Sequence, residues 1–295
     1  MIRPDLSPEL ADALASGAPV VALESTIVSH GMPWPRNAEV ARAVEDRVRA
    51  SGAVPATAAV VDGRLRLGID DAALERLGRG AGVTKASTRD LGAVLAAGGT
   101  AGTTVSATMR IAALAGVSVF ATGGIGGVHR DGVDVSADLT ELGRTEVLVV
   151  SAGAKSILDI PATLERLETA RVPVVVRGAD AVPAFHARDS GLPAPLRLDA
   201  PEAIARVWRM HRACGAGTGM LVANPIPEAH AVPRDAMDAA VADALAAAER
   251  TGVAGPAITP FLLARINEAV PEMLEANVAL VLSNAALAAA IAAAG

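Results

Sequence analysis

The fold is decided by the stretch from Val147 to Ser156, which reads VLVVSAGAKS. Its run of apolar residues predicts a strand buried on both faces, and the small residues that follow predict a tight loop. Parallel α/β sheets place their binding sites at the carboxyl ends of such strands. Because Lys155 lies in this loop, we expect it to belong to a functional site.

The same pattern of apolar runs alternating with longer amphipathic segments extends along the whole chain. Strands are expected over residues 19–23, 57–61, 117–121, 146–150, 172–176 and 220–223, and helices over 36–50, 70–77, 88–97, 105–115, 162–170 and 201–214. From Arg234 onward the pattern is helical, with breaks expected at Pro256, Pro260 and Pro271. This alternation predicts an α/β fold with a largely parallel sheet and helices on both faces. Since no repeat or linker interrupts it, we expect a single domain over residues 1–295.

The composition excludes several classes of function. The net charge of -6 and the lack of a basic run argue against nucleic-acid binding. The single cysteine, Cys214, rules out an internal disulfide and fits a cytoplasmic protein. Residues 1–14 lack a signal-peptide pattern, and the apolar tail over residues 284–295 is too short to span a bilayer, so we interpret it as a docking helix.

Lysine occurs at two positions only, and the other Lys or Arg residues among the total of 26 are all arginines. A nucleophilic amine cannot be arginine because guanidinium stays protonated, so Lys85 and Lys155 are candidates for such a role, unless the pair survives by chance. Burial that lowers a lysine pKa by roughly three units leaves roughly a third of it as free amine at pH 7. In its loop of small residues, Lys155 is a candidate to attack the anomeric carbon of a sugar and form a Schiff base. Lys85 suits a phosphate clamp.

Glu24 ends the first predicted strand, in the stretch VALEST over residues 21–26. A carboxyl group at the lip of an apolar strand has a raised pKa and can act as a general acid. The alternative is a structural carboxylate that caps a nearby turn.

Two small-residue loops are candidates to bind an anion through backbone N–H groups. They read GGTAGTTV over residues 98–105 and TGGIGGVHR over residues 122–130, and each is alternatively a tight turn. His129, in the second loop, is a candidate to orient substrate or a structural histidine. The irregular stretch from Gly178 to Ala200 is either a flap over a site or a surface connection.

Four acidic residues follow the second loop: Asp131, Asp134, Asp138 and Glu141. Oxygen ligands at this density suit Mg²⁺ or Mn²⁺, although a solvated acidic surface is the more common origin of such a cluster.

In combination, these segments resemble one family. The matching stretches are VALESTIVSHGMP at 21–33, GAVPAT at 52–57, VTK at 83–85, TTV at 103–105, FATGGIGGVHR at 120–130, DVSADL at 134–139, AGAKS at 152–156, ANPIPE at 223–228 and TPFLL at 259–263. They are similar to the pseudouridine-5′-phosphate glycosidase family, also called indigoidine synthase A-like. The resemblance implies a three-layer α/β/α sandwich, a homotrimer, and reversible conversion of pseudouridine 5′-phosphate and water into uracil and ribose 5-phosphate.

The resemblance also implies roles for individual residues. Lys155 would be the nucleophile that forms a Schiff base with the ring-opened sugar, Glu24 the proton donor, and Asp134 the ligand of Mn²⁺ or another divalent cation. The implied substrate-binding residues are Lys85, Val105, His129, Ser136, Ala137, Asp138 and Asn284, the last of them near the base.

The chain departs from the family pattern at several positions. The loop over residues 131–133 is shorter, Arg177 stands where many members have tyrosine, Ser283 replaces a common asparagine, and the segment over residues 215–219 differs. These changes leave room for a shifted substrate preference. Two other functions remain open: another Schiff-base lyase or aldolase acting on a sugar phosphate, and a non-catalytic nucleotide-binding module.

Overall fold

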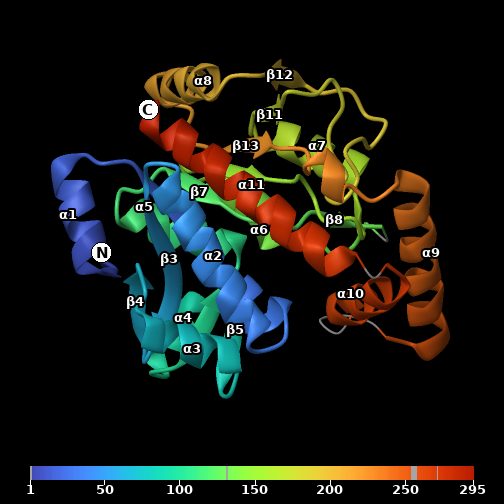
Figure 1. The fold of residues 1–295 in the computed structure, drawn as a ribbon, viewed down its shortest axis with the longest axis horizontal. Coiled ribbons are helices and arrows are strands. Elements are labelled where there is room, and N and C mark those ends of the chain that lie inside the picture. Colours follow the sequence, from blue (N-terminus) through green and yellow to red (C-terminus); the bar gives the residue numbers. More distant parts are fainter. Residues whose placement is uncertain (1, 131, 254–257, 271) are drawn as a thin grey trace.

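The computed structural model describes residues 2–130, 132–253, 258–270 and 272–295, and its centre is an 11-stranded sheet (Figure 1). In spatial order its main path runs through β1 (Asp5–Leu6), β4 (Arg64–Leu67), β3 (Val54–Val61), β2 (Val20–Leu23), β7 (Val119–Ala121), β9 (Leu148–Ser151), β13 (Met220–Ala223), β11 (Val174–Arg177) and β12 (Leu196–Leu198). Off this path, β6 (Thr100–Thr103) pairs with β3 and with β5 (Val83–Ala86). A separate antiparallel pair joins β8 (Val128–His129) to β10 (Leu158–Asp159).

The predicted strand of the VLVVSAGAKS stretch lies in the middle of this sheet. Val149 of β9 pairs with Phe120 on one side and with Leu221 on the other, both in parallel register. All four residues of β9 are buried, as expected for a strand covered on both faces. Among the described strands of the large sheet, only the β3·β4 and β3·β6 pairs are antiparallel. The prediction of a largely parallel sheet is therefore confirmed.

Helices cover both faces, which confirms the three-layer arrangement. On one face α11 (Met273–Ala293) packs against α2 (Arg36–Ala50) and α8 (Pro201–Ala213). On the other, α6 (Ala137–Leu142) contacts α5 (Val105–Leu114) and α7 (Ile160–Thr169). The remaining helices are α1 (Pro8–Ser16), α3 (Asp71–Arg79), α4 (Leu91–Ala96), α9 (Arg234–Thr251) and α10 (Ile258–Ala269), with a π-helical turn at Ile27–Gly31 and a 3₁₀ turn at Glu228–His230. In Figure 1, α9 and α10 pack on each other at one end of the molecule.

The expected break at Pro260 is wrong, because this residue lies in the first turn of α10. Amides in the first turn of a helix have no intrahelical acceptor, so a proline is tolerated there. Pro256 and Pro271 lie outside the described residues.

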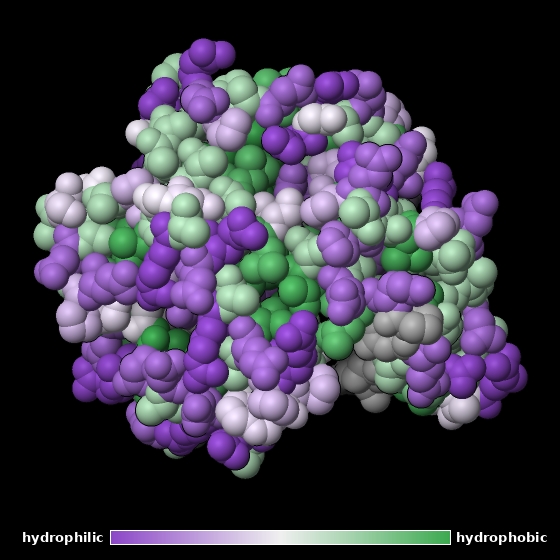
Figure 2. All heavy atoms as spheres, in the orientation of Figure 1, coloured by the Kyte–Doolittle hydropathy of each residue, from purple (hydrophilic) through white to green (hydrophobic). Residues whose placement is uncertain are grey.

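The C-terminal helix is longer than the sequence pattern suggested. It begins at Met273, and its 21 residues, which contain a window of mean hydropathy 1.8, would be long and apolar enough to cross a membrane. However, α11 contacts β2, β7 and β9 as well as α2 and α8, and it crosses the front of the sheet in Figure 1. These contacts account for its apolar sequence, which is that of a buried core helix. Figure 2 shows apolar side chains gathered near the centre of this face, along the boundary between α2 and α11.

Candidate active site

Lys155 lies in the loop after β9, where it is held against the loop after β7. Its backbone N–H donates to the carbonyl of Ile125 at 3.2 Å, and Ala154 forms a parallel bridge with Ile125. Gly153 turns the chain with a φ of +87°, and a Cβ there would stand 3.0 Å from the carbonyl oxygen of Pro183. This turn leaves Lys155 half-buried at the carboxyl end of the sheet, as the sequence predicted.

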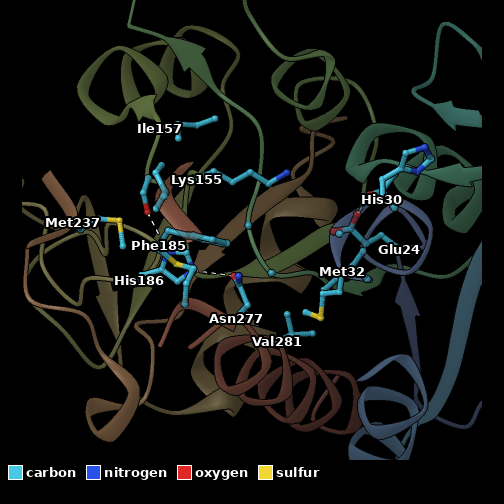
Figure 3. Close-up of a pocket in the computed structure, with 18 of the residues that line it drawn as sticks. Glu24, His30, Met32, Lys155, Ile157, Phe185, His186, Met237, Asn277 and Val281 are labelled. Atoms are coloured by element: carbon cyan, nitrogen blue, oxygen red, sulfur yellow. Dashed lines mark hydrogen bonds between the residues drawn. The ribbon is translucent and has the colours of Figure 1, made fainter. Parts of the chain in front are cut away.

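Glu24 follows β2, which lies beside β7, and β7 lies beside β9, so Glu24 and Lys155 stand at the same edge of the sheet. The carboxylate of Glu24 accepts hydrogen bonds from the hydroxyls of Thr26 and Thr122. These two donors fix its orientation. In Figure 3 the side chain of Lys155 extends across the cavity toward the side where Glu24 and His30 lie.

Two adjoining cavities meet at these residues. The first, here called the apolar cavity, is lined mainly by aliphatic, aromatic and methionine side chains, including Ile27, Met32, Phe185, Met237 and Val281. The second, here called the polar cavity, is lined by hydroxyl groups, by charged side chains, and by backbone of the loop over residues 122–130, here called the glycine loop. Both are lined by Glu24, Thr26, Lys85, Lys155 and Ile157. A ligand with one polar and one flat apolar end would therefore place its middle beside the lysines and Glu24.

Positive charges at this junction lower the pKa values of neighbouring basic side chains. Although much of the Lys85 side chain is exposed, desolvation lowers the pKa of its ammonium group, and the positive charge of Lys155 lowers it further. Glu24 and Asp138 oppose that shift. Burial lowers the pKa of His30, with a further contribution from the charge of Lys85. A cluster of mutually repelling cations is stabilised by an anionic ligand such as a phosphate.

The polar cavity brings together most of the residues predicted to bind substrate. These are Lys85, Val105, His129, Ser136, Ala137 and Asp138. Asp138 has a supporting position, since its carboxylate accepts from the backbone N–H of Ser106 at 2.9 Å and of Gly126 at 2.8 Å. Ser136 caps α6 by accepting from the N–H of Asp138 at 3.2 Å. Through its two backbone contacts, Asp138 connects the glycine loop to the start of α5.

The predicted acidic cluster is dispersed. Glu141 is fully buried and pairs with Arg110 at 2.8 Å and with Arg144 at 2.7 Å, and Asp131 lies outside the described residues. The described part of the chain contains no group of three His, Cys, Asp or Glu side chains arranged to hold a metal. Asp134 lines the polar cavity, with 61% of its side chain exposed, and one of its carboxylate oxygens lies 3.6 Å from Nε2 of His129. One carboxylate on the wall of the polar cavity fits a cation that completes its shell with water and ligand oxygens.

Asn284 does not line either cavity. It is buried, its amide NH₂ donates to the carbonyl of Thr122 at 2.8 Å, and its carbonyl accepts from Asn224 at 2.9 Å. Asn284 therefore holds the loop after β7 in place through a hydrogen bond to its backbone. Asn277, seven residues earlier in α11, does line the apolar cavity, although the family resemblance had pointed to Asn284 and no sequence signal pointed to Asn277.

The stretch from Gly178 to Ala200 forms part of the site wall. Phe185 and His186 are buried and line the apolar cavity. Neither residue stood out in the sequence. The Phe185 ring packs directly against the backbone of Gly124. Only glycine allows this contact, because a Cβ at position 124 would stand 2.4 Å from the ring.

Comparison with known proteins agrees with this arrangement. The chain is 56% identical to the pseudouridine-5'-phosphate glycosidase 2 of Rhizobium johnstonii over 296 residues, covering 99% of this chain and 96% of the relative. It is 54% identical to the pseudouridine-5'-phosphate glycosidase of Deinococcus radiodurans over 293 residues, covering 98% and 94%.

Solved structures extend the likeness to the fold. The prealnumycin C-glycosynthase AlnA, solved in complex with ribulose 5-phosphate, superposes with a TM-score of 0.93 at 41% identity, covering 99% of this chain and 96% of the other. An indigoidine synthase A-like protein of Thermotoga maritima gives a TM-score of 0.90 at 34% identity, covering 99% and 96%. Residues 9–294 match the sequence model described as indigoidine synthase A like protein. The chain belongs to the indigoidine synthase A-like family.

Proposed function

We propose that this protein is a pseudouridine-5′-phosphate glycosidase, which reversibly converts pseudouridine 5′-phosphate and water into uracil and ribose 5-phosphate. The observation that carries this proposal is the meeting of a polar and an apolar cavity at Lys155, Lys85 and Glu24. In this arrangement the phosphate occupies the polar cavity, the base the apolar cavity, and the ribose the junction. The names of the similar proteins, and the ribulose 5-phosphate bound by AlnA, support the same assignment.

The first chemical step opens the sugar ring. The free amine of Lys155 attacks the anomeric carbon, and the bond from that carbon to the ring oxygen breaks. Glu24, as general acid, gives a proton to the departing ring oxygen, and the carboxylate that this leaves takes up the proton lost by the new secondary amine. Lys85 and the backbone of the glycine loop hold the phosphate throughout these steps.

The second step breaks the carbon–carbon bond. The base carbon takes up the proton now held by Glu24, the nitrogen lone pair of Lys155 forms an iminium with the anomeric carbon, and the bonding electrons leave with the base as neutral uracil. Water then adds to the iminium and releases ribose 5-phosphate and the free amine, and the proton that this hydrolysis sets free returns to the Glu24 carboxylate. An amine route suits this bond, since protonation of a leaving heteroatom cannot assist its cleavage.

Uracil release tests the proposal. We expect the purified protein to liberate equal amounts of uracil and ribose 5-phosphate from pseudouridine 5′-phosphate, and to form the nucleotide when both products are supplied. A different Schiff-base lyase would form an adduct with a sugar phosphate yet release no uracil. A non-catalytic binding module would retain nucleotide without turnover. Either result would reject the proposed activity.

A divalent cation such as Mn²⁺ is proposed at Asp134, where it would add positive charge beside the phosphate. EDTA is expected to lower uracil release, and added Mn²⁺ is expected to restore it. The variant Asp134→Asn should weaken this response and raise the Mn²⁺ concentration needed for half-maximal rate about tenfold or more, since a carboxylate ligand is replaced by a weaker neutral donor. Full activity after exhaustive chelation would exclude this role for Asp134.

We further propose that the protein works in the cytoplasm as a homotrimer. The resemblance to the family and the lone, exposed Cys214 support these assignments. Light scattering coupled to gel filtration measures the mass of the assembly directly.

A further inference from the structure

His186 lies between α11 and the loop after β9 that carries Lys155. Only 3% of its surface is exposed, and its ring stands edge-on to Phe185 with centroids 4.3 Å apart. Its ring nitrogens contact Asn277 of α11 on one side and Ser156, the neighbour of Lys155, on the other. The mechanism above assigns it no role. Figure 3 shows it beside Asn277, on the wall of the apolar cavity.

The hydrogen bonds of His186 define the position of its proton. Nε2 lies 2.9 Å from the side-chain carbonyl oxygen of Asn277, and Nδ1 lies 3.4 Å from the hydroxyl of Ser156. Burial lowers the pKa of His186 to about 4, so the ring is neutral and carries one proton at neutral pH. A carbonyl oxygen can only accept, so that proton is on Nε2. Nδ1 is then an acceptor that faces the Ser156 hydroxyl, which also lies 3.5 Å from the carbonyl oxygen of Ala184.

This arrangement determines which end of the Asn277 amide is available to a ligand. The carbonyl is occupied by His186, which turns the NH₂ group away from the histidine. Asn277 is half-buried, lines the apolar cavity and points into it in Figure 3. Within the described residues, no acceptor is hydrogen-bonded to this NH₂ group. An unoccupied amide donor in an apolar cavity selects a ligand that presents a carbonyl oxygen.

We infer that His186 is a positioning residue, which holds the Asn277 amide so that its NH₂ group donates to a carbonyl oxygen of the nucleobase. The inference rests on the proposed function and adds a rule of selectivity to it. A base that presents an amino group at this point would set two donors against each other, leaving both unpaired in an apolar environment.

The variant His186→Phe tests this role, because phenylalanine keeps an aromatic ring but removes both hydrogen bonds. In the synthetic direction, KM for uracil is expected to rise about five- to tenfold, the equivalent of one lost hydrogen bond. Borohydride trapping of ribose 5-phosphate on Lys155 should remain at the wild-type extent. His186→Gln places an amide donor near the former Nε2 position, and it should bring KM back to within about twofold of wild type.

A double-mutant cycle separates positioning from general support of the fold. If His186 acts through Asn277, His186→Phe should change KM for uracil little in an Asn277→Ala background. Additive effects of the two substitutions would overturn the inference, as would a loss of Lys155 adduct as large as the loss of uracil affinity. Failure of the wild-type protein to release uracil at all would instead reject the proposed function, so the two failures are distinguishable.

Discussion

Replacing Lys155 with alanine is expected to lower the rate of uracil release by roughly 10⁴-fold or more, the scale on which enzymes lose activity with their nucleophile. The amine supplies both the bond to the anomeric carbon and the lone pair that expels the base, so no other group can carry the reaction along the same path. The polar and apolar cavities remain in this variant. The variant should therefore still bind the nucleotide. Its Kd, measured by calorimetry, should rise by no more than about tenfold, the effect of losing one cation near the phosphate.

The matched control is Lys155→Arg. Arginine keeps the positive charge and a long side chain but stays protonated, so it is expected to bind the phosphate and yet to be inactive. Borohydride added with ribose 5-phosphate should fix the sugar on Lys155 in the wild type and leave both variants unmodified by mass spectrometry. An adduct on Lys85 in the wild type, with Lys155 unmodified, would show that Lys85 is the nucleophile and Lys155 is not.

The central sheet and the position of Lys155 were predictable because both depend on local sequence. A buried parallel strand is a short unbroken apolar run, and the residues after it lie at the carboxyl edge whatever the rest of the chain does. Helix α2 begins and ends at Arg36 and Ala50, as its amphipathic pattern predicted. Strands such as β4 and β12 were missed because they are not unbroken apolar runs, although the alternation RLRL of β4, exposed and buried in turn, is a strand pattern.

The apolar half of the site was less predictable because it depends on tertiary packing. Asn277 and Asn284 are seven residues apart on α11, so they face the same side, and only the position of the helix along the sheet decides which of them reaches the cavity. His186 and Phe185 come from an irregular stretch whose path no periodicity describes. The roles of Glu24, Lys85, Val105 and the residues of the polar cavity stay predictions, and the catalytic role of Glu24 is the one with the sharpest test.

Glu24→Gln is expected to lower kcat by about 10²- to 10⁴-fold, the usual contribution of a general acid, with KM for the nucleotide changed much less. Glutamine has nearly the same shape, and the hydroxyls of Thr26 and Thr122 can still hydrogen-bond to its amide. The substitution therefore removes the transferable proton while it preserves the position of the side chain. Steady-state kinetics that separate kcat from KM measure the effect.

The chemistry of ring opening gives a second measurement on the same variant. Ribose 5-phosphate reaches its open aldehyde form without help from the protein, so Glu24→Gln should still yield a borohydride-trapped adduct on Lys155. Cleavage of pseudouridine 5′-phosphate, which must open a closed ring first, should be impaired far more than this trapping. An equal loss of both would show that Glu24 serves the lysine rather than the ring oxygen, and a rise in KM with unchanged kcat would make it a binding residue only.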